Sequence, residues 1–389
     1  MREFVSKRAK ALKPSGIRKF FDLAAGRKDV ISLGVGEPDF ITPWYIRDVG
    51  ITALKSGYTQ YTSNKGLADL RAEISEYLSS RFSVSFDKEN VVITMGASEA
   101  IDLSLRAIVD EGDEILIPDP SYVSYGPIVE LTGGVPVAVP TSGENGFKLT
   151  PENLEKVITP KTKALIFPYP NNPTGGIMEK QYIEDIIPVI LKHDLLVISD
   201  EIYAELTYGG KHCSIVAFPE LDGRVVLIGG FSKSFAMTGW RIGFACATAE
   251  VYKAMLKIHQ YAAICAPIFS QYAALAALKI GKTDGFSSVN EMRLEYDKRR
   301  RFMLGAFKRM GLTCFEPKGS FYVFPCVKST GLSGEEFATR LLSEKSVAVV
   351  PGSAFGEFGK DYIRCSYAYS MDALKIAVDK IAEFVSELK

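Results

Sequence analysis

Histidine is scarce in this chain, with only His193, His212 and His259 among its 389 residues. No metal-ligand spacing joins these three residues, so the sequence does not predict a zinc site. Positive and negative side chains balance to a formal net charge of zero, whereas proteins that bind nucleic acid usually carry a basic excess or a basic stripe. The composition therefore predicts no nucleic-acid partner.

Long apolar runs are also absent from the sequence. No stretch reaches the roughly 20 residues that a transmembrane helix needs, and Met1 to Phe4 contain no apolar core of a signal peptide. The six cysteines form no C-x-x-C pair, and several of them lie in apolar runs. These features favour reduced, buried thiols in a cytoplasmic protein that has no membrane partner.

The chain is long enough for more than one core. Its composition, 47% hydrophobic and 24% charged residues, is typical of a globular protein. From about Tyr45 to Gly281, apolar runs typical of strands alternate with helical patterns, which predicts an α/β fold around a mostly parallel sheet. We predict a large domain at residues 41–285 and a smaller α/β domain at residues 1–40 and 286–389.

One segment carries the strongest chemical signal. It reads FSKSFAMTGWRIG from Phe231 to Gly243, and it follows an apolar strand pattern, Val225 to Ile228. A lysine such as Lys233 is costly to bury unless it has a function, and desolvation lowers its pKa. The neutral amine is then a nucleophile that can form an imine with an aldehyde. The alternative is two surface cations, Lys233 and Arg241, on a connection between strands.

Ser232 to Gly243 fits the pattern S-K-x-F-x-x-T-G-W-R-x-G throughout. The segment resembles the lysine segment of the class I aminotransferases, the fold type I family that uses pyridoxal phosphate, and the resemblance extends over nearly the whole chain. It implies an α/β fold whose large domain has a mostly parallel seven-stranded sheet flanked by helices. It also implies that Lys233 carries the cofactor covalently and that Ser232 and Arg241 bind its phosphate.

Two further stretches resemble phosphate-binding elements of the family. A strand pattern ends at Gly96-Ala97-Ser98 before a helix, and small residues at a helix start present free N–H groups to an anion. A plain strand–helix turn is the alternative. The resemblance implies that this turn binds the phosphate. It also implies that Tyr61, in a polar loop, reaches the phosphate of the other subunit in a homodimer with composite active sites.

Residues after three strand patterns resemble those that surround the cofactor ring in the family. By this resemblance Tyr122 stacks on the ring, whose π-system gains from a flat neighbour. Asn172, in an N-P-T-G motif, and Tyr203, in a D-E-I-Y motif, hydrogen-bond the ring oxygen. Asp200 pairs with the protonated ring nitrogen, which keeps the ring an electron sink. A core tyrosine, a turn and a helix cap are the alternatives.

The substrate carboxylate has two main predicted partners. Arg364 lies within an apolar strand pattern, where an arginine needs an anionic partner. An internal salt bridge is the alternative, but the family places its carboxylate-binding arginine in this R-x-S-Y setting. The N–H of Gly36, in a G-E-P-D-F motif, lies against the same carboxylate in the family, and glycine permits such close approach. Tyr122 and Asn172 also border the substrate by resemblance.

The function implied is that of an aminotransferase, which moves an amino group between an amino acid and a 2-oxo acid, with 2-oxoglutarate as the expected acceptor. Aspartate-type or aromatic-type donors are expected, and N-acetyl-diaminopimelate is a further candidate. A pyridoxal-phosphate-dependent β-lyase on the same fold is the alternative. A non-enzymatic regulator that binds DNA is disfavoured by the neutral charge.

Four local features complete the sequence predictions. Many relatives have a serine three residues before the lysine, whereas this chain has Gly230. We predict cis peptide bonds at Asp119–Pro120 and Asn172–Pro173, by resemblance to the family. A helix is predicted at Ser15 to Ala24. The long helix predicted at Asn290 to Met310 is rich in arginine and lysine; we expect its charges to form a solvated face and the helix to link the two domains.

Overall fold

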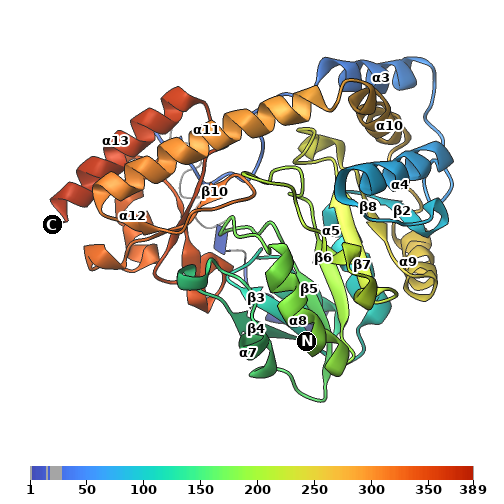
Figure 1. Ribbon diagram of the computed structural model, residues 1–389, viewed down its shortest axis with the longest axis horizontal. Coiled ribbons are helices and arrows are strands. Elements are labelled where there is room, and N and C mark those ends of the chain that lie inside the picture. The colour runs from blue at the N-terminus through green and yellow to red at the C-terminus, as the bar shows by residue number, and fades with distance from the viewer. Residues whose placement is uncertain (1, 15, 18–28, 389) are drawn as a thin grey trace.

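The computed structural model describes residues 2–14, 16–17 and 29–388. The helix predicted at Ser15 to Ala24 therefore lies mostly outside the described residues. Figure 1 shows a central sheet with helices around it and, beside it, a second group of short strands with the helices α12 (Gly334–Lys345) and α13 (Met371–Glu387). Among the described residues, no helix has the length and apolar character that crossing a bilayer requires.

Seven strands form the central sheet in the order β2-β8-β7-β6-β5-β3-β4. Their bounds are Val91–Thr94 (β2), Glu114–Asp119 (β3), Val135–Pro140 (β4), Thr162–Phe167 (β5), Leu196–Asp200 (β6), Val225–Gly230 (β7) and Gly243–Cys246 (β8). Strands β3 to β7 pair in parallel, and β8 runs antiparallel to both β2 and β7. The predicted seven-stranded, mostly parallel sheet is confirmed.

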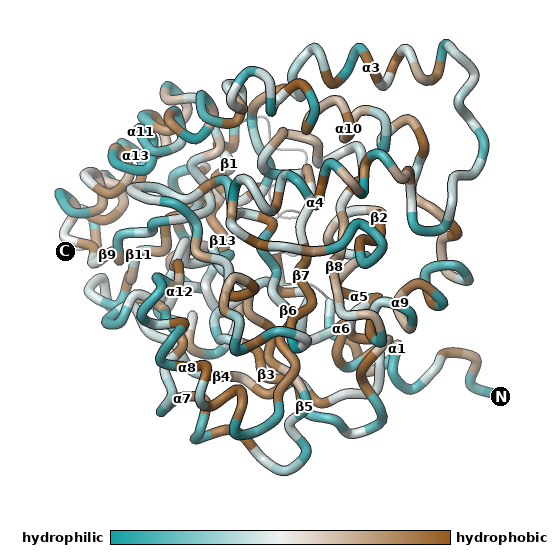
Figure 2. Tube along the Cα trace, turned by 45° about the vertical axis from the view of Figure 1, so that its right-hand side comes forward, coloured by the Kyte–Doolittle hydropathy of each residue, from teal (hydrophilic) through white to brown (hydrophobic). Residues whose placement is uncertain are grey.

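The central strands are apolar along their length because helices cover both faces of the sheet. In β6, Ile198 packs in a cluster with residues of α5 and α9, whereas its neighbour Val197 packs in a cluster with residues of α8. Successive side chains of a strand point to opposite faces, so each face contributes to a separate core. Figure 2 shows these strands in brown between helices that are partly teal.

Among the described residues, the helices of this larger part come from residues 44–283, with α1 before them. Their bounds are Lys7–Ala11 (α1), Trp44–Lys55 (α3), Ala68–Phe82 (α4), Ala97–Ile108 (α5), Tyr125–Thr132 (α6), Pro151–Glu155 (α7), Lys180–Lys192 (α8), Ala249–Ala262 (α9) and Ile268–Thr283 (α10). Helix α10 packs on α3 and α4, and α5 packs on α9. The strand–helix alternation predicted for residues 45–281 is thus observed.

The second group of elements, here termed the C-terminal part, comprises β1 and residues 286–388. Its strands are Ile31–Ser32 (β1), Thr313–Cys314 (β9), Tyr322–Val323 (β10), Pro325–Cys326 (β11), Val347–Ala348 (β12), Val350–Pro351 (β13) and Ile363–Ser366 (β14). They form three small sheets: β1 with β12, β9 with β11, and β10-β14-β13. These strands are short, so backbone pairing alone fixes few residues of this part.

Helix α11 (Ser287–Met310) joins the two parts. In Figure 1 it runs from the neighbourhood of α3 and α10 to that of α12 and α13. Its charges do not all face solvent, because Arg299 and Arg300 are only 6% and 7% exposed. The predicted solvated face is therefore wrong for these two residues.

The predicted cis peptide bonds at Asp119–Pro120 and Asn172–Pro173 are both present, and Tyr169–Pro170 is also cis, which the sequence analysis did not predict.

Candidate active site

The parallel strands end at one edge of the sheet, and a cavity of about 730 Å³ opens there. Open α/β sheets bind ligands at this edge, outside the carboxyl ends of their strands. Most of the predicted site residues line the cavity: Gly36, Ala97, Ser98, Tyr122, Asn172, Asp200, Tyr203, Ser232, Lys233, Arg241 and Arg364. The two predicted residues that do not line it are Gly96 and Tyr61.

Lys233 lies in the turn after β7 and is half-buried. Its Nζ donates a hydrogen bond to the carbonyl oxygen of Gly36 at 2.7 Å, and it lies 6.0 Å and 5.7 Å from the ring centres of Tyr203 and Phe321. Burial lowers the pKa of Lys233 to about 8, and the nearby cations Arg364 and Arg241 act in the same direction. A substantial fraction of this amine is therefore neutral near pH 8.

Asp200 ends β6 and is buried at the base of the cavity. The hydroxyl of Tyr125 donates to its Oδ2 at 2.8 Å, and the N–H of Ile202 donates to its Oδ1 at 3.2 Å. Burial raises the pKa of Asp200 to about 6, against the effect of the Tyr125 hydrogen bond. A carboxylate in such a place is stabilised by a cationic partner.

Arg364 lies in β14 and is 2% exposed. Its guanidinium stacks between the rings of Tyr322 and Phe355, 4.4 Å and 4.8 Å from their centres. Nη1 donates to Oδ1 of Asn172 at 2.9 Å, Nη2 donates to the carbonyl oxygen of Gly34, and Nε has no hydrogen-bond partner among the described residues. With the described residues Arg364 forms no ion pair, so the alternative of an internal salt bridge gains no support.

In the turn before α5, the backbone lies close to the guanidinium of Arg241. Gly96 has φ +81°, in the left-handed region that favours glycine, and a Cβ there would lie 2.7 Å from Nη2 of Arg241. Ala97 and Ser98 begin the helix, so their N–H groups have no carbonyl one turn earlier to accept them. Arg241 donates to the carbonyl oxygen of Thr238 at 2.9 Å. Free N–H groups and a guanidinium together suit an anion.

A family model and several known proteins match this chain over most of its length. The family model described as "Aminotransferase class I and II" matches residues 28–381. The chain is 50% identical to a putative aminotransferase, YugH, of Bacillus subtilis, with 99% of both chains covered. It is 43% identical to aromatic-amino-acid aminotransferase 2 of Thermococcus litoralis, again with 99% of both chains covered.

A solved structure, the aspartate aminotransferase of Thermus thermophilus with maleate, superposes with a TM-score of 0.92 at 36% identity, and the match covers 98% of this chain and 100% of that one. The chain belongs to the class I and II aminotransferases. The predicted family, fold class and enzyme class are thereby confirmed.

Members of the class I and II aminotransferase family use pyridoxal phosphate, and the residues present fit this group. An aldehyde suits the half-buried amine of Lys233, and a pyridine nitrogen that carries a proton suits the buried carboxylate of Asp200. A phosphate suits the turn at residues 96–98 and the guanidinium of Arg241. The residues that line the cavity therefore match the aldehyde, the ring nitrogen and the phosphate of this group.

Position 230, where the resemblance to the family leads us to expect a serine, is a glycine in this aminotransferase, and the structure gives a reason. A Cβ at this position would lie 3.0 Å from Cδ1 of Ile202 and 3.2 Å from Cα of Gly243. Both distances are shorter than ordinary van der Waals contact, so a serine would require its neighbours to move. Here the glycine accommodates the close packing of β7 on β8.

Two tyrosines of the site were missed from the sequence. Tyr125 binds Asp200, and the hydroxyl of Tyr322 lies 3.1 Å from that of Tyr203. A Cβ on Gly36 would lie 2.3 Å from the Tyr322 hydroxyl, so this glycine also makes room for a tyrosine. Tyr125 lies three residues after Tyr122 and begins α6, which is a weak signal. No motif marked Tyr322.

Tyr61 is 78% exposed and contributes nothing to the cavity of its own chain. The region predicted to form a helix from Ser15 contributes Ile17, which is described and lines the cavity.

Proposed function

We propose that this aminotransferase acts through pyridoxal phosphate held in the cavity, and that it moves an amino group from an aspartate-type or aromatic-type amino acid to a 2-oxo acid such as 2-oxoglutarate. The observation that carries the proposal is the meeting of Lys233, Asp200 and Arg364 in one cavity. Each of the three has a different chemical need: an aldehyde, a cation and a carboxylate. A pyridoxal phosphate with an amino acid beside it meets all three needs.

When bound, the cofactor supplies an aldehyde for covalent attachment and a ring that accepts an electron pair. Lys233 Nζ would be the attachment point, and as a free amine it would be the base that takes the proton from the substrate Cα. Asp200 keeps the proton on the ring nitrogen. Arg364 and the N–H of Gly36 orient the substrate carboxylate.

The remaining assignments place the cofactor. Tyr122 stacks on the ring, while Asn172 and Tyr203 hydrogen-bond the ring oxygen. The phosphate has a separate set of partners: Gly96, Ala97, Ser98, Ser232, Arg241 and Tyr61 of the partner subunit. Exposure of Tyr61 in the single chain supports its reaching across a homodimer interface.

A reduction experiment tests the attachment. Sodium borohydride added to the holoenzyme should fix the cofactor to the peptide that contains Lys233, as mass spectrometry would show. The matched control is Lys233→Ala, which should leave the cofactor removable by dialysis. Label on another lysine would overturn the assignment.

A substrate panel separates the aminotransferase from the β-lyase alternative. From a donor with a β-leaving group, such as cysteine, the lyase would release ammonia, pyruvate and the sulfur product without any 2-oxo acid acceptor, whereas transamination requires the acceptor in equal amount. Donors to be compared are aspartate, phenylalanine, tyrosine and N-acetyl-diaminopimelate.

Subunit hybrids test the composite site. In a hybrid of a Lys233→Ala chain with a Tyr61→Ala chain, one site has an intact Lys233 from one chain and an intact Tyr61 from the other. If Tyr61 reaches across, each hybrid has one wild-type site, whereas if Tyr61 serves its own chain, every site is damaged.

We also propose that residues 41–285 form one domain and that residues 1–40 with 286–389 form another. We further propose that the protein is cytoplasmic.

A further inference from the structure

Three consecutive arginines of α11 lie in very different surroundings. Arg299 and Arg300 are buried, whereas the side chain of Arg301 is 73% exposed. Neighbouring positions on a helix point about 100° apart, so two buried arginines in succession reach different segments. Each buried guanidinium needs close acceptors, because desolvating the charge is costly without them.

Arg299 binds the segment that leads into the site from β1. Its Nη1 donates to both carboxylate oxygens of Asp39, at 2.9 Å and 2.8 Å, and its Nε donates to Glu295 at 3.0 Å. Three residues before Asp39, the carbonyl oxygen of Gly36 accepts from Lys233, and that of Gly34 accepts from Arg364.

No backbone–backbone hydrogen bond to the described residues holds residues 34–42. Side-chain contacts therefore decide where this segment lies. Among them, the Arg299 ion pair joins it to the long helix, and the guanidinium also lies 5.5 Å from the ring centre of Phe40.

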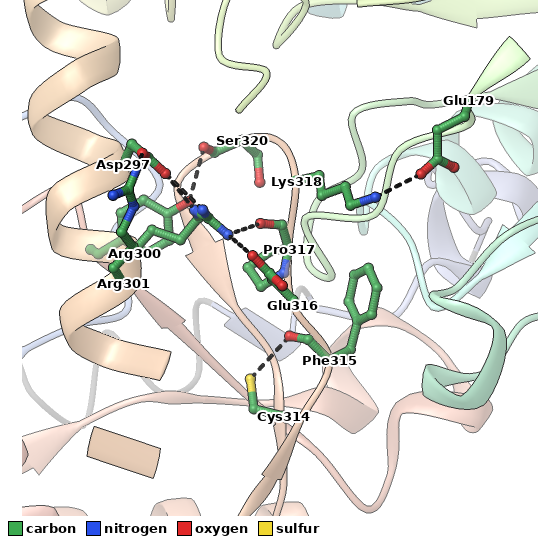
Figure 3. A network of polar contacts seen from close by, with 11 residues as sticks. Glu179, Asp297, Arg300, Arg301, Cys314, Phe315, Glu316, Pro317, Lys318 and Ser320 are labelled. Carbon is green, nitrogen blue, oxygen red and sulfur yellow. Dashed lines mark hydrogen bonds and ion pairs between the residues drawn. The ribbon is translucent and has the colours of Figure 1, made fainter. Parts of the chain in front are cut away.

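Arg300 binds the other segment that leads into the site. Its Nε donates to Asp297 at 2.8 Å, and its Nη1 donates to Glu316 at 2.9 Å and to the carbonyl oxygen of Pro317 at 3.0 Å, as Figure 3 shows. This segment then crosses to the larger part, where the N–H groups of Lys318 and Gly319 donate to Gly175 at 3.0 Å.

The segment continues to Tyr322, whose ring stacks on Arg364. Its strand β10 is only two residues long, so the ladder alone fixes little of it. The contacts of Arg300 act at the start of the segment, where Figure 3 shows α11 beside it.

We propose that Arg299 and Arg300 are positioning residues, which hold segments 34–40 and 316–322 so that Gly36 and Tyr322 meet Arg364 and Lys233 in the active site. The inference deepens the proposed function, because both segments border the end of the cavity assigned to the substrate carboxylate. Neither arginine lines the cavity. Each acts through the segment it binds.

The test compares three variants of the holoenzyme: Arg299→Met, Arg300→Met and the exposed control Arg301→Met. Methionine keeps an unbranched apolar stem and removes the guanidinium. Hydrogen–deuterium exchange should rise about tenfold at the hydrogen-bonded amides of residues 33–35 for Arg299→Met and of Lys318 and Gly319 for Arg300→Met. Arg301→Met should change neither segment.

A kinetic measurement provides the second readout. Both buried variants should raise KM for the amino donor about tenfold and change kcat less than threefold, because carboxylate binding weakens while Lys233 and the sheet edge stay in place. The absorbance spectrum of the bound cofactor should not change. Arg299→Lys should have a lower KM than Arg299→Met, since lysine keeps the positive charge but lacks the planar guanidinium that binds both carboxylate oxygens.

Asp39→Asn removes the partner of Arg299 and leaves α11 intact. It should reproduce the exchange pattern of Arg299→Met, and the double variant should add little to either. If Arg299→Met fails to fold, Asp39→Asn carries the same prediction. Glu316→Gln serves in the same way for Arg300.

Equal exchange increases in both segments for either arginine variant would overturn the proposal, since that pattern means a general loss of stability. Unchanged exchange in both segments would also overturn it. The exchange result does not depend on which lysine carries the cofactor, so its failure is distinguishable from failure of the proposed function.

Discussion

The two halves of the active site are held in different ways. On the sheet side, Asp200 and Lys233 lie at or just after the ends of β6 and β7, whose backbone pairs along ladders with neighbouring strands. On the other side, Gly36 follows β1, and Tyr322 and Arg364 lie in the C-terminal part, whose strands are two to four residues long.

The two sides of the site should therefore respond differently to substitutions. A strand in the middle of a sheet cannot move without breaking hydrogen bonds on both sides, so the residues that follow it are fixed by the fold. Segment 34–40 depends on side-chain contacts, among them that of Arg299 on α11, whereas segment 316–322 combines the contacts of Arg300 with backbone hydrogen bonds to Gly175, Tyr208 and Tyr367. Changes on α11 should therefore affect substrate binding more than cofactor chemistry.

The largest expected effect is on the sheet side. Lys233→Ala should lower kcat for transamination by at least about 10³-fold, because the variant loses both the attachment point and the base at the substrate Cα. Single-turnover absorbance measurements with added cofactor would show the loss. The variant should melt within a few degrees of the wild type. Substantial remaining activity would mean that the sheet edge does not carry the chemistry.

The next effect tests the opposite side of the cavity. Arg364→Leu should reduce kcat/KM for the amino donor by about 100-fold, which corresponds to the loss of charge-assisted hydrogen bonds worth about 3 kcal/mol. Cofactor content, measured by absorbance after alkali release, should stay at one per chain. An unchanged kcat/KM would remove Arg364 from substrate binding.

The pH dependence of stability isolates the buried carboxylate of the sheet side. Asp200 has its pKa raised from the ordinary 3.8 to about 6, so between these pH values the unfolded chain binds fewer protons than the native state. Its contribution to stability therefore falls as the pH rises from about 4 to about 6.

The cofactor-free Asp200→Asn variant should accordingly gain stability relative to the wild type over this range, by at most about 3 kcal/mol. Urea unfolding at pH 4.5 and pH 7 measures the difference. Glu201→Gln, at the neighbouring buried carboxylate, is the comparison variant. The same difference for Asp200→Asn at both pH values would contradict the prediction.

The smallest expected effect comes from a substitution at the closely packed sheet edge. Gly230→Ser should destabilise the protein by about 1 kcal/mol, because the added Cβ crowds Ile202 and the backbone of β8. The double variant with Ile202→Val should recover part of the loss by freeing the side-chain contact. A serine variant as stable as the wild type would show that the edge can relax.

Much of the sheet and of the cofactor side could be predicted from the sequence. Apolar runs of four to six residues read directly as buried strands, and the residues just after them lie at the same sheet edge by the rules of parallel topology. The motifs that resemble the family singled out Tyr122, Asn172, Asp200 and Lys233, and the strand patterns placed them at this edge. Local pattern and local structure coincide there.

Tyr322, Tyr125 and the buried arginines could not be found in this way. The run Arg299-Arg300-Arg301 is uniformly charged in sequence, yet two of its members are buried and one is exposed. Whether a charge is solvated depends on which distant carboxylates face it, and Asp39 lies 260 residues before Arg299. No local pattern carries that information.

The sequence by itself determined the family, the order of strands and helices in the larger part, and the residue types that surround a cofactor, because those depend on hydrophobic periodicity and on motifs a few residues long. Only the tertiary structure decided that Arg364 lies between two rings without a carboxylate among the described residues, that Tyr125 binds Asp200, and that α11 binds two separate segments. These features arise where distant stretches meet, since burial and hydrogen-bond partners are properties of the packed chain.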